Sequence, residues 1–156
     1  LLDPLFQSGL GTDCVTLEIQ ESTLLDDRSD VIAANIAALA DAGFRIELDD
    51  FGTGHTALTS LRRFPVHQIK IDRSLVTGID SEPASRAIVD AISRLAAQLG
   101  IGVIAVGVET HAELAALRGL GIARVQGNLI SPTVSPHDLC QWLERRKSVD
   151  PAVRRS

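Results

Sequence analysis

The sequence predicts an α/β fold built on parallel strands, and three observations support this. Short β-branched runs alternate with longer helical stretches along the chain. Such alternation over short links is typical of parallel βαβ units, which either close into a barrel or remain an open sheet. Polar side chains recur where the expected strands end, and both architectures place their chemistry there. The chain has 156 residues, 45% of them hydrophobic, which is enough for one domain with a real core.

The strands are predicted from short runs rich in Val and Ile, of which "VTLEI" and "FRIEL" are the first two. Branched side chains favour strands because they pack well on a pleated surface. Each run is short and lies near glycine or other turn-forming residues, as expected for a strand. The five expected strands are residues 15–19, 44–48, 67–71, 102–108 and 123–127.

The helices are predicted from apolar periodicity and from the residues that end each stretch. The clearest helix covers 84–99, and Gly100 follows it as a C-terminal capping glycine. Its apolar stripe consists of Ile88, Ile92, Leu95 and Leu99. The other expected helices are residues 29–42 ending at Gly43, 57–63 halted near Pro65, 111–120, and 136–146.

Composition restricts the partners and the location that we expect. The net charge of −5 argues against broad binding to a nucleic-acid polymer. No apolar run approaches the roughly 20 residues of a membrane span, and the first residues do not resemble a signal peptide. Two distant cysteines, Cys14 and Cys140, indicate reduced thiols rather than a disulfide framework. We therefore expect a cytoplasmic protein.

One buried charge is predicted from the alternation of side chains along the third strand. Residues 69–72 read Ile-Lys-Ile-Asp, so Lys70 and Asp72 share one face. An ammonium group inside a sheet or barrel is costly unless a partner compensates its charge. Acidic residues on the neighbouring strands could provide that compensation.

Three carboxylates are expected at the same edge of the sheet. Glu18 lies in the first strand, and Asp49 and Asp50 follow the second. Their mutual repulsion would be relieved by a divalent cation, and hard oxygen ligands suit Mg²⁺ or Mn²⁺. The alternative remains open that these residues cap helices or lie in solvated loops, as acidic residues at strand ends often do.

Five motifs together resemble one known family. They are "LEIQES", "DDFGTGHTALTSL", "PVHQIKIDRSLV", "AIVDAISRLAAQLGIGVIAVGVET" and "LGIARVQGNLIS". In this order and spacing they closely resemble the EAL-domain family of cyclic di-GMP phosphodiesterases, from about residue 13 to about residue 145. The resemblance implies a TIM-type (βα) barrel, of which this chain supplies about five of the eight βα units. We expect residues 1–147 to form a partial EAL domain and residues 148–156 to be a polar tail or linker.

The resemblance also implies roles for individual residues. The family hydrolyses one phosphodiester bond of cyclic di-GMP to give linear pGpG with the help of two divalent cations. By this resemblance Glu18, Asp49 and Asp50 correspond to ligands of Mg²⁺ or Mn²⁺. The resemblance also implies that Lys70 and Gln126 occupy catalytic positions. Glu21 resembles a glutamate that supports the loop after Asp50, and that loop is linked to dimer contacts in relatives.

Three departures from the family pattern weaken the expectation of catalysis. The Glu-Ala-Leu signature and an asparagine ligand have no counterpart in this chain. Val106 stands where relatives carry a glutamate of the metal site, and valine cannot coordinate a cation. The segments "GHTA" and "ISPT" also differ from the usual family sequences. We expect impaired metal binding.

These observations lead to two hypotheses about function. The first is a cyclic di-GMP signalling domain of the EAL type with weak or no hydrolysis, which leaves open whether the chain is an enzyme. The second is a non-catalytic cyclic di-GMP receptor or a protein-interaction domain with a regulatory role.

Five strands cannot close an eight-stranded barrel, so either a missing N-terminal half of the barrel or a homodimer is expected to cover the open edges.

Overall fold

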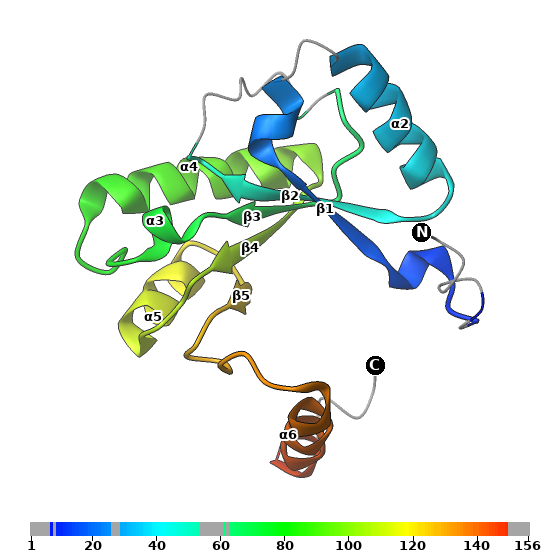
Figure 1. Cartoon of the computed structure of the whole chain (residues 1–156). Helices are drawn as coiled ribbons and strands as arrows, with labels where there is room; N and C mark the ends of the chain where they lie inside the picture. Colours follow the sequence, from blue (N-terminus) through cyan, green and yellow to red (C-terminus); the bar gives the residue numbers. More distant parts are fainter. Residues whose placement is uncertain (1–6, 8, 26–28, 54–60, 62, 150–156) are drawn as a thin grey trace.

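The computed structural model describes residues 7, 9–25, 29–53, 61 and 63–149, which form an α/β structure around a five-stranded sheet (Figure 1). The strand order is β1-β2-β3-β4-β5, and every neighbouring pair is parallel. The strands are β1 (Thr16–Gln20), β2 (Arg45–Phe51), β3 (Gln68–Ile71), β4 (Gly102–Val106) and β5 (Arg124–Gln126). The α-helices are α2 (Ser29–Asp41), α3 (Arg73–Val76), α4 (Pro83–Leu99), α5 (His111–Gly119) and α6 (Pro136–Val149). Two 3₁₀ turns, η1 (Thr12–Cys14) and η2 (Glu21–Leu25), flank β1.

The expected elements agree with the structure in kind and order, and the differences lie mostly at their ends. Strand β2 continues to Phe51, so Asp49 and Asp50 lie inside the strand rather than after it. Strand β4 ends at Val106 instead of residue 108, because Gly107 turns the backbone to a φ of 83°. The sequence did not predict α3, η1 or η2. The helix expected at 57–63 lies largely outside the described residues.

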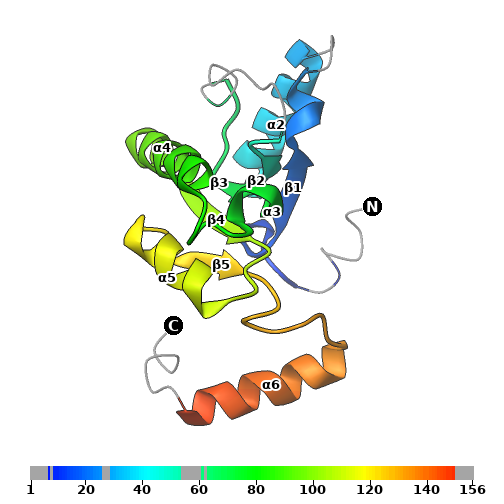
Figure 2. The same ribbon diagram turned by 90° about the vertical axis from the view of Figure 1, so that its left-hand side faces the viewer.

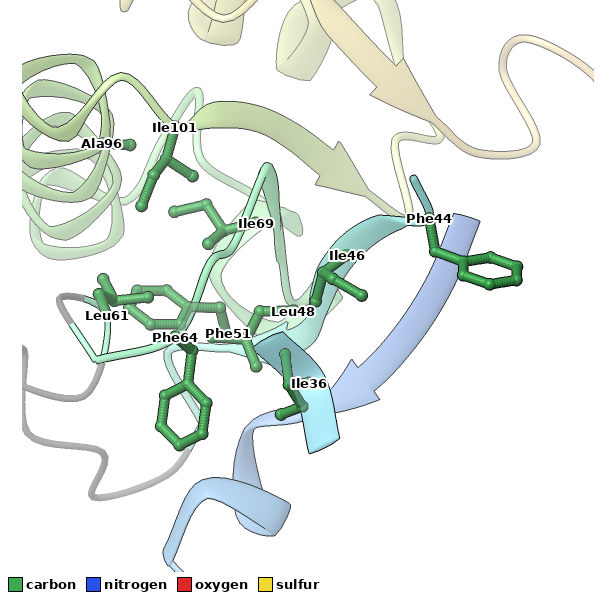
Figure 3. Packing of buried hydrophobic residues seen from close by; sticks show 10 residues of the cluster. All are labelled: Ile36, Phe44, Ile46, Leu48, Phe51, Leu61, Phe64, Ile69, Ala96 and Ile101. Atoms are coloured by element: carbon green, nitrogen blue, oxygen red, sulfur yellow. The ribbon is translucent and has the colours of Figure 1, made fainter. Parts of the chain in front are cut away.

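The side chains of β1, β2 and β3 divide into an apolar face and a polar face of the sheet. In β2, Ile46 and Leu48 are almost fully buried, whereas the alternating Arg45 and Glu47 are more exposed. Figure 3 shows the apolar side chains of β2 and Ile69 of β3 together with Ile36 of α2 and Ala96 of α4. The helices therefore cover the apolar face, and this fixes the face on which the polar side chains lie.

A second apolar cluster supports the other half of the sheet. Its buried residues include Ile71 from β3, Ala105 from β4 and Leu117 from α5. Beyond the strands, the amides of Gly107 and Val108 both donate hydrogen bonds to the carbonyl of Gln126, at 2.8 and 3.1 Å. These bonds hold the carboxyl ends of β4 and β5 together.

The last helix lies apart from the sheet, at the end of an extended connection after β5 (Figures 1 and 2). Its side chains Leu139 and Leu143 are 45% and 42% exposed. Among the described residues no strand lies beyond β1 or β5, so both outer edges of the sheet are unpaired there. Within the same part of the chain, no helix is long and apolar enough to cross a membrane.

Candidate functional site

A buried lysine joins three strands at the polar face of the sheet. The Lys70 side chain on β3 is only 7% exposed, and its Nζ lies 3.0 Å from Oε2 of Glu18 and 3.3 Å from Oδ1 of Asp49. Glu18 belongs to β1, two strand spacings or about 10 Å from the β3 backbone. The long Lys70 and Glu18 side chains therefore meet across β2. The sequence argument anticipated acidic partners on neighbouring strands; Asp49 comes from the neighbouring strand β2, and Glu18 comes from β1, one strand farther away.

The protonation state of Lys70 follows from these contacts. Burial alone would lower the pKa of the Lys70 ammonium. The hydrogen bond to Glu18 and the negative charges of Asp49 and Glu18 outweigh that effect and raise the pKa above its usual value. Lys70 is therefore charged at neutral pH and holds a fixed positive charge between two carboxylates.

A β-bulge explains why two consecutive aspartates lie at this edge. Leu48 pairs with Ile69 and Phe51 with Ile71, so three steps along β2 match two steps along β3. The extra residue falls at Asp49 and Asp50, and Asp50 has a φ of 56°, in the left-handed region. Bulges redirect side chains and are frequent beside active sites. The bulge returns Phe51 to the apolar face while Asp49 stays on the Lys70 face.

A second carboxylate contact fixes the backbone just after the bulge. Glu21, 4% exposed in η2, accepts a hydrogen bond of 2.9 Å from the Gly52 amide. Gly52 has a φ of 100°, which favours glycine, and a Cβ there would collide with Leu75. The segment after β1 is therefore connected directly to the turn after β2. This contact is compatible with the support role that the family resemblance implies for Glu21.

The two remaining positions singled out in the sequence, Val106 and Gln126, lie at the carboxyl ends of β4 and β5. Val106 of β4 pairs with Gln126 of β5 in the sheet register, and both residues end their strands. By alternation from Lys70, which pairs with Ile104, Val106 faces the polar side of the sheet. The valine therefore places an apolar side chain at an edge that is otherwise polar.

The carboxylates of Glu18, Asp49 and Asp50 are of the chemical type that binds a hard divalent cation, but the three are not grouped around one point. Glu18 and Asp49 bring two carboxylate oxygens within 3.3 Å of one nitrogen, and Asp50 follows Asp49 in the bulge. Carboxylate oxygens are preferred ligands of Mg²⁺ and Mn²⁺, which commonly retain several waters. Among the described residues, no three His, Cys, Asp or Glu side chains are grouped closely enough to hold a metal ion.

The sequence interpretation missed a connection between the loops after β3 and β4. Arg73 at the start of α3 pairs with Glu109 after β4, with 2.9 Å between Nη2 and Oε1. Asp72 caps α3 by accepting a hydrogen bond of 2.8 Å from the Ser74 amide. Farther along, Thr110 and Glu113 form a capping box at the start of α5. Thr-x-x-Glu before a helix is a visible signature, so this box could have been predicted.

Residues 1–133 match the EAL domain family. Over 129 residues the chain is 38% identical to a Pseudomonas aeruginosa protein named cyclic di-GMP phosphodiesterase PA2567, covering 83% of this chain and 22% of the relative. It is also similar to the EAL domain of Mycobacterium smegmatis DcpA, with 34% identity and a TM-score of 0.84, covering 90% of this chain and 63% of that one. A Klebsiella pneumoniae BlrP1 structure described as a manganese and cyclic di-GMP complex is 38% identical, with a TM-score of 0.77 and coverage of 82% and 32%.

These matches show a shared fold over most of the chain. Five parallel strands with their helices correspond to part of the TIM-type barrel of the solved EAL structures. The chain spans about a fifth of the length of the curated relatives that it matches. The activity of those longer proteins therefore does not transfer directly to this chain.

Replacing Lys70 with methionine is expected to lower the free energy of unfolding by roughly 1–3 kcal/mol. The change removes both ion pairs and leaves the Glu18 and Asp49 carboxylates facing each other without a cation. Urea denaturation followed by circular dichroism measures the loss. Arg94→Met is the matched control, because it removes an exposed pair with Asp90 and should cost less than about 0.5 kcal/mol. Equal losses in the two variants would contradict the structural role of Lys70.

Proposed function

The chain belongs to the EAL domain family, and from this membership we propose that it forms part of a cyclic di-GMP signalling domain with little or no hydrolytic activity. The observation that carries the proposal is the Lys70 ammonium held between Glu18 and Asp49 at the carboxyl ends of the strands. In parallel α/β folds this is the edge at which ligands bind. A relative named as a cyclic di-GMP phosphodiesterase and a relative in complex with manganese and the nucleotide support the choice of ligand.

The polar residues at this edge have complementary roles in the proposal. Glu18, Asp49 and Asp50 would hold Mg²⁺ or Mn²⁺. When bound, the cation neutralises charge on the phosphodiester and on oxygens that develop charge during hydrolysis. Lys70 provides a fixed positive charge for the phosphoryl oxygens or an attacking water. Gln126 supplies a neutral polar group near the end of β5, and Glu21 holds the turn at Gly52 through its hydrogen bond.

The expectation of weak hydrolysis depends on Val106. The family resemblance places a metal-site glutamate there, and the structure puts Val106 beside Gln126 at the end of β4. An isopropyl group offers no oxygen to a cation, so cation affinity and transition-state stabilisation should both fall. Glu109 is no evident replacement, since its carboxylate pairs with Arg73.

The alternative is a non-catalytic receptor or a regulatory domain that binds protein. The loss of one acidic ligand favours this alternative, because nucleotide binding needs fewer precisely placed groups than phosphodiester hydrolysis does. In either case the outer edges of β1 and β5, which are unpaired in the described part of the chain, need a cover. The proposal includes either a homodimer or additional βα units that complete the barrel.

Calorimetric titration of the protein in its longest natural form with cyclic di-GMP and Mg²⁺ or Mn²⁺ is expected to show micromolar binding. Chromatography of the same mixture should show no steady formation of pGpG. Lys70→Met should weaken binding by roughly tenfold or more because it removes the fixed positive charge. Arg94→Met, the same kind of truncation on the surface of α4, should leave the affinity unchanged.

Two results would overturn parts of this proposal. Steady conversion of cyclic di-GMP to pGpG would contradict the loss of hydrolysis. Absence of nucleotide binding in the presence of either cation would contradict the ligand assignment. It would then favour a domain that acts only through protein contacts.

Val106→Glu is expected to raise the affinity for Mn²⁺ by roughly tenfold and to increase hydrolysis, because it restores a carboxylate at the end of β4. Metal titration by calorimetry and pGpG formation measure the two effects. Val106→Gln is the matched control, since it has nearly the same size without the charge. Equal behaviour of the two variants would show that the defect lies elsewhere in the site.

A further inference from the structure

One buried carboxylate, that of Glu113, connects two loops at the carboxyl edge of the sheet. Glu113 in α5 is 5% exposed. Its Oε1 accepts a hydrogen bond of 3.0 Å from the amide of Gly78, which follows α3. Its Oε2 accepts bonds of 2.9 and 3.0 Å from the amides of Glu109 and Thr110, which follow β4. A single side chain thus satisfies three backbone donors from two separate segments.

Helix capping explains only part of this arrangement. In a capping box the N3 glutamate bonds the backbone at the N-cap, as Glu113 does with Thr110, and Thr110 Oγ1 accepts from the Glu113 amide at 3.1 Å. The bond to Gly78 spans 35 residues of sequence and contributes nothing to the cap of α5. This third bond indicates a role in tertiary structure.

The two connected segments are also linked on their exposed side. Arg73 pairs with Glu109 at 2.9 Å, and a Cβ added to Gly107 would meet the Arg73 side chain at its Cβ, Cγ and Cδ. The Arg73 stem therefore lies against the Gly107 backbone. The first segment begins after β3, which carries Lys70, and the second begins after β4, which carries Val106. The buried Glu113 contacts and the exposed ion pair thus join the loops that flank the candidate site.

The charge of Glu113 is maintained in this environment. Burial alone would raise the pKa of the carboxyl, but the hydrogen bonds from Gly78, Glu109 and Thr110 outweigh it and lower the pKa. Three amide donors to an ionised acceptor are charge-assisted bonds, which are stronger than neutral ones.

We propose that Glu113 is a positioning residue whose carboxylate locks the loops after β3 and β4 into one unit, and that this unit sets the affinity of the site for its phosphodiester ligand. The hydrogen bonds of Glu113 keep the Arg73–Glu109 pair in place, and Arg73 lies three residues after Lys70 in the chain. The part concerning ligand affinity rests on the proposed function, whereas the coupling of the two loops does not.

Glu113→Gln tests the proposal because it keeps the size of the side chain and removes one of its two acceptor oxygens. With the amide in either orientation, an NH₂ group must face the Gly78 amide or the amides of Glu109 and Thr110. We expect hydrogen exchange to accelerate in both loops, at Gly78 and at Glu109, and affinity for cyclic di-GMP to fall about tenfold. Exchange is measured by NMR and affinity by calorimetry on the protein in its longest natural form.

Thr110→Ala is the matched control, because it removes the other half of the capping box and leaves the bond from Gly78 to Glu113. It should accelerate exchange at the start of α5 while leaving Gly78 protected and the affinity nearly unchanged. Equal loss of affinity in both variants would overturn the proposal, since Glu113 would then act only as a cap. Unchanged affinity in Glu113→Gln would also overturn it.

The two measurements, hydrogen exchange and ligand affinity, distinguish a failure of this proposal from a failure of the proposed function. If the unaltered protein does not bind cyclic di-GMP, the proposed function fails. Hydrogen exchange then remains as the test of whether Glu113 couples the two loops. Acceleration in both loops of Glu113→Gln would then support the coupling. Acceleration confined to one loop would overturn it.

Discussion

The burial of one positive charge, that of Lys70, constrains much of this structure. An ammonium removed from water is stable only with close acidic partners, and the partners here come from β1 and β2. Their side chains must reach the same point across three strands, which requires the observed parallel register and the carboxyl ends of those strands at one edge. The apolar residues of the same strands face the helices, so the packing of the core and the position of the charge depend on each other.

The backbone around Lys70 is shaped by side chains that hold its turns. The bulge at Asp49 and Asp50 adds one residue to β2, and Glu21 fixes the turn that follows through Gly52. On the other side, Glu113 bonds to both loops that follow β3 and β4. Buried carboxylates thus order the backbone on either side of the site. Such support is what a site needs if its polar groups are to bind a charged ligand without large rearrangement.

The sequence predicted the alternation of strands and helices, the polar edge and the need of Lys70 for acidic partners, because alternation and apolar periodicity report directly on burial. It did not predict that β2 continues through Asp50, since a bulge depends on the register with β3 rather than on local propensity. The four residues of α3 were too few to show a period. The bond between Glu113 and Gly78 could not be predicted because it joins residues distant in sequence. The family resemblance, rather than any spacing, distinguished a partial barrel from an open sheet.

The protonation of Lys70 is the most direct test of this account. NMR titration of its side-chain ammonium, with ¹⁵N-labelled protein, measures the pKa at the one group on which the charge arrangement depends. Contacts with Glu18 and Asp49 predict a pKa above the usual value of 10.5. A pKa below that value would mean that burial outweighs the carboxylates, and it would contradict the paired site described here.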